Sequence, residues 1–129
     1  MSDLKQAQLM LDMARKDLKA LKGMLDQDIF EEEIFGFHAQ QAIEKALKGR
    51  IALMGHEYPL THDISTLLEF LENRGQEVEP FWDFVEFNAF SVRFRYETFD
   101  ALEEPINRKG TIEKIEDLLR QVEKQISPK

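Results

Sequence analysis

The sequence predicts an all-α fold, an antiparallel up-and-down four-helix bundle with an additional C-terminal helix. Two observations lead to this class. Apolar residues recur at spacings of three and four along nearly the whole chain of 129 residues, which is typical of helices that bury one side. No segment alternates polar and apolar residues around a two-residue glycine turn, as paired strands would. We therefore expect helices joined by loops of about five to fifteen residues and packed as one bundle.

The first expected helix covers about residues 3–25, and the second covers about residues 29–54. Asp3 stands in the first turn of the first helix. Asp28 is the expected N-cap of the second helix, and the three glutamates that follow suit the positive end of its dipole. Gly55 is expected to end this helix. The apolar stripe of the first helix consists of Ala7, Leu11, Ala14, Leu18, Leu21 and Leu25.

The third expected helix covers about residues 63–73, and the last covers about residues 111–126 with Thr111 as its cap. Each has one apolar side at helical spacing. This side consists of Ile64, Leu67, Leu68 and Leu71 in the third helix, and of Ile112, Ile115, Leu119, Val122 and Ile126 in the last.

The fourth expected helix starts near Pro80 and runs to about residue 96, and it is apolar on two sides. With an α-helical period, one side carries Trp82, Val85, Ala89, Val92 and Tyr96, and nearly the opposite side carries Phe84, Phe87 and Phe94. Such a helix has no side suited to water. Two explanations remain open: the last helix or residues 97–110 cover the second side, or a second copy of the chain covers it in a homodimer.

Length and composition favour a single domain over residues 1–129, large enough for one core. The chain has no cysteine, so neither disulfides nor thiol chemistry are expected. No stretch reaches 18 consecutive apolar residues, as a membrane span requires, and residues 1–5 lack the features of a secretion signal. These features predict a cytoplasmic protein without membrane contact. The formal net charge of −8 disfavours broad, non-specific nucleic-acid binding.

The middle of the second helix combines Gln, Glu and Lys with small and apolar residues. Gln41, Lys45 and Lys48 fall at positions i, i+4 and i+7, so an amide and two ammonium groups share one side. Such groups suit a nucleotide or another phosphate-bearing ligand. The surrounding residues 35–56 carry a net charge of +2. The alternative is that both lysines pair with Glu44 and with neighbouring helices.

Two histidines lie near this side of the second helix. His62 stands just before the third helix, in the sequence Thr61-His62-Asp63-Ile64. It could hydrogen-bond to Glu44 or to the end of the second helix, or it could face a ligand. His38 shares the side of Gln41 and is either a packing residue or a ligand contact. No glycine-rich phosphate loop, nucleophile elbow or metal-ligand pattern is visible, so we expect no catalytic residue, metal or cofactor.

Arg95 and Tyr96 complete the candidate ligand site. Arg93 and Arg95 lie among aromatic residues, so a guanidinium could pair with a phosphate while the Tyr96 ring stacks on a base. Alternatively, the arginines bridge to Glu86, Glu97 or Asp100. The candidate ligand-binding residues, in a polar cleft between the second and fourth helices, are Gln41, Lys45, Lys48, His62, Arg95 and Tyr96.

Three motifs in this order resemble the HEPN family (higher eukaryote and prokaryote nucleotide-binding). They are Gln40-Gln41-Ala42-Ile43-Glu44-Lys45-Ala46-Leu47-Lys48, Thr61-His62-Asp63-Ile64 with Leu67-Leu68, and Arg95-Tyr96, and the resemblance covers about residues 3–125. It implies a helical bundle that forms a homodimer. For small stand-alone members it implies a gene beside that of a minimal nucleotidyltransferase. Such pairs are similar to toxin–antitoxin modules, or to a split nucleotidyltransferase whose HEPN subunit helps to bind the substrate.

Many HEPN proteins are instead metal-independent ribonucleases, which carry an Arg and, a few residues later, a His. Here no histidine follows Arg93 or Arg95. Arg50 and His56 have the spacing of this Arg–His pair but lie at the end of the second helix and in the loop after it, where the family does not place the pair. Acid–base cleavage of RNA would lack its usual proton carrier. We therefore expect a binding subunit of a nucleotidyltransferase without catalysis of its own; the alternatives are a ribonuclease toxin with an unusual base and a dimeric scaffold without ligand.

Overall fold

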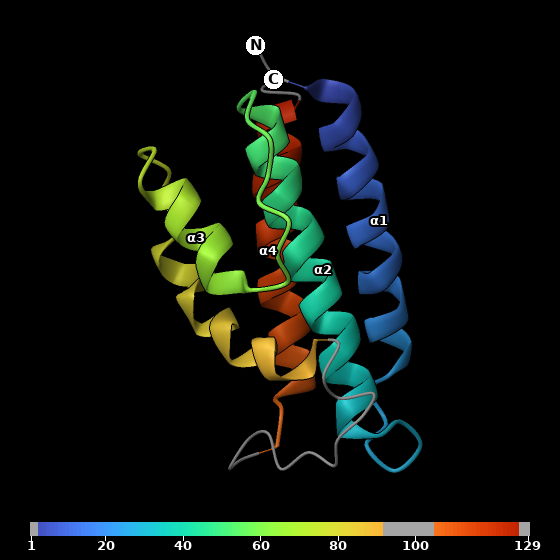
Figure 1. Ribbon diagram of the computed structural model, residues 1–129. Coiled ribbons are helices and arrows are strands. Elements are labelled where there is room, and N and C mark those ends of the chain that lie inside the picture. Colours follow the sequence, from blue (N-terminus) through green and yellow to red (C-terminus); the bar gives the residue numbers. More distant parts are fainter. Residues whose placement is uncertain (1–2, 92–104, 127–129) are drawn as a thin grey trace.

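The computed structural model describes residues 3–91 and 105–126, and all regular structure in these residues is helical. The predicted fold class, a helical bundle with an additional C-terminal helix, is confirmed. In Figure 1, α1 descends, α2 ascends beside it, and α4 ascends behind α2. The elements are α1 (Leu4–Gly23), α2 (Glu32–Leu53), α3 (Ile64–Glu72), the 3₁₀ helix η1 (Glu79–Phe90) and α4 (Arg108–Ile126).

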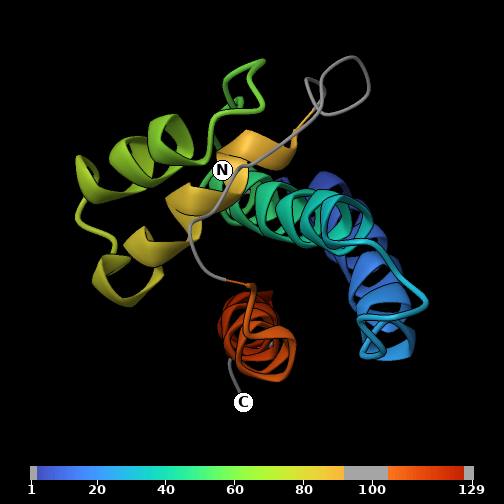
Figure 2. The ribbon, with the colours of Figure 1, turned by 90° about the horizontal axis from the view of Figure 1, so that it is seen from below.

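Helix α2 is the central element of the bundle. It contacts all four other elements, and Figure 2 shows it between α1 on one side and the pair of α3 and η1 on the other. Its buried residues therefore lie on several sides, and they include the charged residues Glu44, Lys48 and Arg50. A helix buried this widely fixes the polar groups on it more firmly than a surface helix would.

The start of α2 differs from the prediction. The N-cap is Glu31 and not Asp28, because residues 26–30 form a separate turn. In this turn the Asp26 carboxylate accepts a hydrogen bond from the Asp28 backbone nitrogen at 2.9 Å, and the Asp26 carbonyl accepts one from the Phe30 nitrogen at 3.0 Å. An aspartate that folds the chain back in this way competes with helix formation.

Helix α4 begins three residues earlier than predicted, at Arg108 and not at Thr111. The reason is a set of contacts that the sequence pattern does not reveal. The buried Arg108 guanidinium donates hydrogen bonds to the carbonyls of Met24 and Phe30, both at 2.7 Å. Arg108 thereby ties the start of α4 to the loop between α1 and α2, so the first turn of α4 is held in place.

The fourth helix was expected to have an α-helical period, and this prediction is wrong. Residues Glu79–Phe90 form a 3₁₀ helix, in which residues three apart lie above one another. Phe81, Phe84, Phe87 and Phe90 therefore line up on one side, are all buried, and have neighbouring ring centroids 5.8, 6.4 and 6.1 Å apart. Asp83 and Glu86 are exposed on the other side. The element does have a side suited to water, contrary to the α-helical interpretation.

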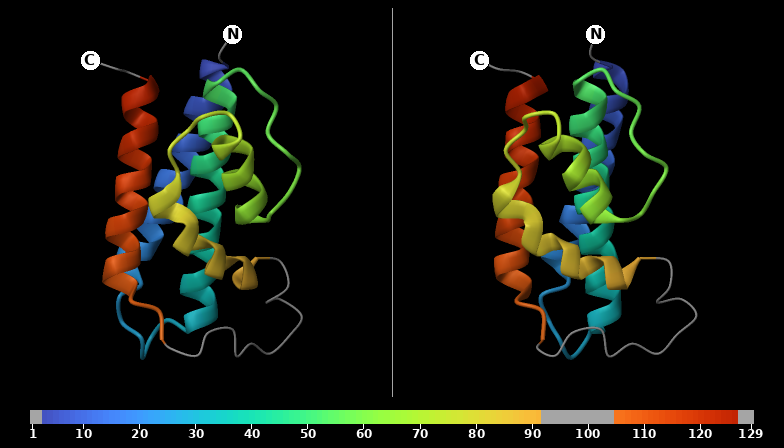
Figure 3. Two further views of the ribbon diagram at one scale, coloured as in Figure 1. Left: turned by 90° about the vertical axis from the view of Figure 1, so that its left-hand side faces the viewer. Right: turned by 60° about the vertical axis from the view of Figure 1, so that its left-hand side comes forward.

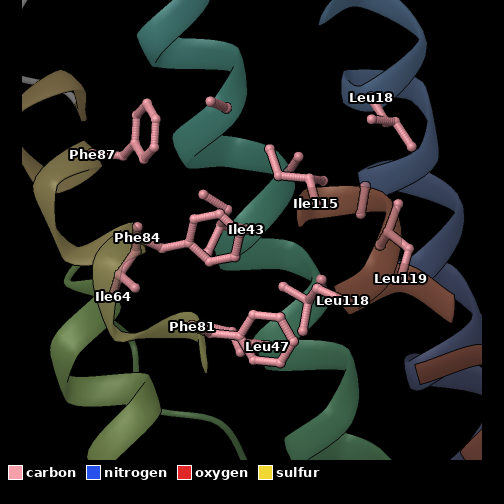
Figure 4. Packing of buried hydrophobic residues seen from close by; sticks show 14 of the residues in the cluster. Leu18, Ile43, Leu47, Ile64, Phe81, Phe84, Phe87, Ile115, Leu118 and Leu119 are labelled. Atoms are coloured by element: carbon pink, nitrogen blue, oxygen red, sulfur yellow. The ribbon is translucent and has the colours of Figure 1, made fainter. Parts of the chain in front are cut away.

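The phenylalanine stripe is covered within one chain. Figure 4 shows Phe81 and Phe84 facing Ile43 and Leu47 of α2, with Ile115 of α4 nearby. The four phenylalanines of η1 are thus covered mainly by α2, whereas the two explanations that the sequence left open concern the last helix with residues 97–110 and a second copy of the chain; both stay predictions. Trp82 and Val85 of η1 are half-buried.

Residues 54–63 join α2 to α3 without regular structure, and we call residues 55–63 the strap. Gly55 ends α2 as predicted, with a positive φ of 84° that favours glycine. The strap then returns along the front of α2 to about its middle, where α3 begins (Figure 1), and Figure 3 shows it arching outward on the way. It therefore lies over the segment of α2 that carries the candidate ligand residues.

Candidate functional site

Three buried polar residues form a row on α2 beneath the strap. Gln40, Glu44 and Lys48 are four residues apart and are 0%, 5% and 8% exposed. The Gln40 amide donates to one Glu44 oxygen at 2.8 Å, and the Lys48 ammonium donates to the other at 2.9 Å. We call these three residues the polar row.

The strap is attached to this row by His62 and Tyr58. The His62 Nδ1 lies 2.9 Å from a Glu44 carboxylate oxygen, and the His62 carbonyl accepts a hydrogen bond from Gln40 at 3.0 Å. The Lys48 ammonium lies 5.4 Å from the centre of the Tyr58 ring, a cation–π distance. The predicted contact between His62 and Glu44 is therefore present, and it leaves 55% of the His62 side chain exposed.

The charge on Glu44 is stabilised by its neighbours. Burial alone would raise the pKa of this carboxyl group, since it disfavours the charged form. Hydrogen bonds from Lys48, Gln40 and His62 outweigh burial and lower the pKa of Glu44 below its ordinary value. Glu44 is thus ionised at neutral pH and holds its three partners in fixed positions.

Lys45 belongs to a second cluster, between α2 and α1. Its ammonium group lies 2.8 Å from the Asp17 carboxylate, and the other oxygen of Asp17 lies 3.2 Å from Nδ1 of His38. His38 is therefore engaged with a neighbouring helix, in agreement with the packing interpretation. Both predicted phosphate-binding lysines are ion-paired, which is the alternative that the sequence left open.

Gln41 lies between the two clusters and is half-buried. Its amide nitrogen donates to the Gln40 side chain at 2.7 Å. The structure thus brings Gln41, Lys45, Lys48 and His62 together around one segment of α2. Arg95 and Tyr96, like Arg93, lie outside the described residues.

Sequence reasoning missed three groups that build this arrangement: Gln40, Asp17 and Tyr58. Gln40 precedes Glu44 by four residues, and this spacing could have identified it as a partner on the same helix side. Asp17 and Tyr58 come from other elements, and no local pattern signals their contacts. The Tyr58 hydroxyl accepts a hydrogen bond from Gln6 of α1 at 2.7 Å, so Tyr58 joins the strap to both helices.

Arg50 and His56 do not form a catalytic pair. The Arg50 guanidinium donates to the Gln76 side chain at 3.0 and 3.2 Å, whereas the His56 ring packs edge-on against Phe70 with centroids 5.7 Å apart. Burial lowers the pKa of Arg50, and within the described ranges its Nη1 atom is buried without a hydrogen-bond partner. The two side chains therefore contact different residues, Gln76 and Phe70.

Comparison with models of known protein families shows to which family the chain belongs. The model of the HEPN domain matches residues 7–128. The chain belongs to the HEPN family. Comparisons with curated proteins and with solved structures gave no match. The resemblance seen in the sequence is thereby confirmed, and HEPN membership suggests a function related to nucleotides or RNA.

The part of this HEPN chain that the structure describes was also compared with what a metal site and a membrane span require. Within residues 3–91 and 105–126, no three or more His, Cys, Asp or Glu side chains are placed to hold a metal ion. In the same part of the chain, no helix combines the length and apolarity needed to cross a membrane. The cytoplasmic location and the single domain over residues 1–129 stay predictions.

Proposed function

We propose that this HEPN chain is a nucleotide- or substrate-binding subunit that acts with a separate minimal nucleotidyltransferase, in a module of toxin–antitoxin type. Family membership supplies the class of function. The observation that carries the finer proposal is the set of polar side chains on α2 and the strap, in which Lys45, Lys48 and His62 are each fixed by a carboxylate. Side chains fixed in advance lose little entropy when a ligand binds.

The charges of the two clusters bear on how a ligand would bind. Two lysines face two carboxylates, Asp17 and Glu44, so their formal charges cancel when the histidines are neutral. A phosphate would have to compete with these carboxylates for the ammonium groups. We therefore expect modest affinity in the isolated chain and higher affinity once a partner subunit contributes further groups, as in a site shared between two proteins.

Calorimetric titration with ATP tests the binding role. We expect heat of binding in the wild-type chain and a loss of affinity of about tenfold in Lys45→Gln, the factor that one charge-assisted hydrogen bond contributes. Lys114→Gln is the matched control, since this lysine pairs with Asp83 on η1. Absence of heat with ATP, other nucleotides and RNA, alone and with the neighbouring gene product, would favour a scaffold without ligand.

A ribonuclease toxin is the second candidate. The observation in its favour is His62: Glu44 holds its Nδ1, and the exposed side chain leaves the other ring nitrogen available to accept a proton. Labelled RNA incubated with the chain and a chelator distinguishes the two functions. Intact RNA together with bound nucleotide supports the binding subunit, whereas cleavage that Arg95→Ala or His62→Asn abolishes supports the ribonuclease.

A further inference from the structure

The polar row is buried at a place where apolar residues would serve stability as well. Removing Glu44 and Lys48 from water costs free energy that their attraction only partly returns. A buried ion pair of this kind therefore contributes little net stability. The strap covers this ion pair: His62 contacts Glu44, and the Tyr58 ring contacts Lys48. The position of the pair therefore points to a role other than stability.

The strap itself is weakly attached to the bundle. Between its ends, the strap has two backbone hydrogen bonds: the His56 nitrogen donates to the Ile51 carbonyl of α2 at 3.3 Å, and the Thr61 nitrogen donates to the Pro59 carbonyl at 2.9 Å. Leu60, its most apolar residue, is 98% exposed and adds nothing to the core. The side chains that hold the strap over α2 are the polar His62 and the ring of Tyr58, which packs at the edge of the core. Segments with few buried apolar contacts open at lower free energy than the core does.

A hollow at the base of the strap leaves room for movement. It measures about 390 Å³ and lies between the strap, the start of α1 and the end of α2. The residues that line it are Asp3, Gln6, Ala52, His56, Glu57, Tyr58 and Leu60. The Tyr58 ring therefore packs against the edge of the core and also has open space beside it.

The two ends of the strap differ in stiffness. At one end, Gly55 has the backbone freedom that a hinge needs. At the other end, the Asp63 carboxylate caps α3 by accepting from the Ser65 nitrogen at 2.9 Å, and Asn88 of η1 donates to the same carboxylate at 2.8 Å. Movement would thus occur between Gly55 and His62, while α3 stays in place.

We propose that the strap is a hinged lid over the polar row: it swings about Gly55 when the contacts of Tyr58 with Gln6 and of His62 with Glu44 break, and it exposes Lys48 and Glu44 to a phosphate-bearing ligand. The inference rests on the proposed binding function for the identity of the ligand. The opening itself is a property of the free chain, so it can be measured without any ligand.

The reactivity of Lys48 reports the opening. Acetic anhydride modifies lysines that water reaches, and mass spectrometry gives the rate at each site. Lys16 and Lys19 on α1 are exposed and serve as internal references. We expect Lys48 to react at least tenfold more slowly than these references in the closed chain, because its ammonium group is buried and ion-paired.

Gln6→Leu and Tyr58→Phe break the contact at the hollow and leave the polar row intact. We expect either change to speed acetylation of Lys48 about fivefold, the factor that loss of one hydrogen bond gives. Gln8→Leu is the matched control: Gln8 lies on the same helix and donates to Asp12, away from the strap, so Lys48 should react at the wild-type rate.

Three results would overturn the lid. One is a wild-type Lys48 that reacts as fast as Lys16 and Lys19. Another is a rate that Gln6→Leu and Tyr58→Phe leave unchanged. The third is a speed-up in these variants that equals the speed-up in amide hydrogen exchange of the α2 core, because Lys48 would then react through global unfolding. Added ATP separates the two proposals: if Gln6→Leu opens the strap but ATP does not protect its Lys48, the lid stands and nucleotide binding at this row fails.

Discussion

The ring of Phe90 packs directly against the backbone of α2 at Gly36, where even a methyl group would overlap it. Gly36→Ala should therefore destabilise the fold by about 1–3 kcal/mol through overpacking, measured as a lower midpoint of thermal or urea unfolding. Gly23→Ala is the control, since nothing lies within 4 Å of an added methyl group there. Equal stability of Gly36→Ala and wild type would show that Phe90 can shift aside.

Arg108 joins two distant parts of the chain. Arg108→Met should destabilise the protein by about 3 kcal/mol, because the partly buried residues Met24 and Phe30 would lose the charged donor to their carbonyls. Arg120→Met should change stability by less than about 0.5 kcal/mol, since this exposed arginine pairs with Asp117 at the surface. Urea unfolding of both variants gives the comparison; similar losses would contradict the proposed role of Arg108.

The buried Arg50 guanidinium lacks a carboxylate partner among the described residues, and burial lowers its pKa. Gln76→Glu would place a carboxylate where the amide oxygen now accepts its two hydrogen bonds. Because Gln76 is only half-buried, the new charge keeps part of its hydration, and we expect stabilisation of about 1 kcal/mol at pH 7. The expected sign is a higher melting temperature; a lower one would mean that dehydration of the glutamate dominates.

Asp63 should contribute a pH-dependent part of the stability. Hydrogen bonds from Ser65, opposed by partial burial and supported by Asn88, hold the pKa of Asp63 below its ordinary value. A carboxyl group with a lower pKa in the folded state stabilises the fold above its unfolded pKa, and this contribution is lost as the pH falls through the folded value. The stability difference between wild type and Asp63→Asn should thus be constant near neutrality and vanish in acid. Stability curves from pH 2 to pH 7 check this; a constant difference at all pH values would contradict it.

The sequence predicted the helices where one period explains the pattern, and failed where a second period competes. In α1 the apolar spacing of three and four matches the buried residues Ala7, Leu11, Ala14, Leu18 and Leu21. In η1 the phenylalanines recur every third residue, which an α-helix would spread around its surface but a 3₁₀ helix stacks. The strict spacing of three from Phe81 to Phe90 was the signal for this difference.

The role of the candidate site stays a prediction, and the pairing of its residues could be read from the sequence only in part. The spacing of Gln41, Lys45 and Lys48 predicts one shared side, whereas the structure pairs Lys45 with Asp17 of α1 and Lys48 with Glu44 beneath the strap. Asp17 pairs with Lys45 across 28 positions of sequence, and no local rule connects two residues so far apart. The sequence predicted a polar cleft with phosphate-binding lysines and left open that both lysines are ion-paired; tertiary contacts give the ion pairs.

The contacts of Arg108 with the loop after α1 span 84 and 78 positions of the chain. During synthesis, the turn that joins the first two long helices is complete well before the side chain that fixes it has been made. An emerging polypeptide would therefore form α1 and α2 as a loose hairpin and acquire its final geometry only when the last helix arrives. Removal of residues 108–126 should leave that hairpin without its clamp and expose the apolar side of α2 to aggregation.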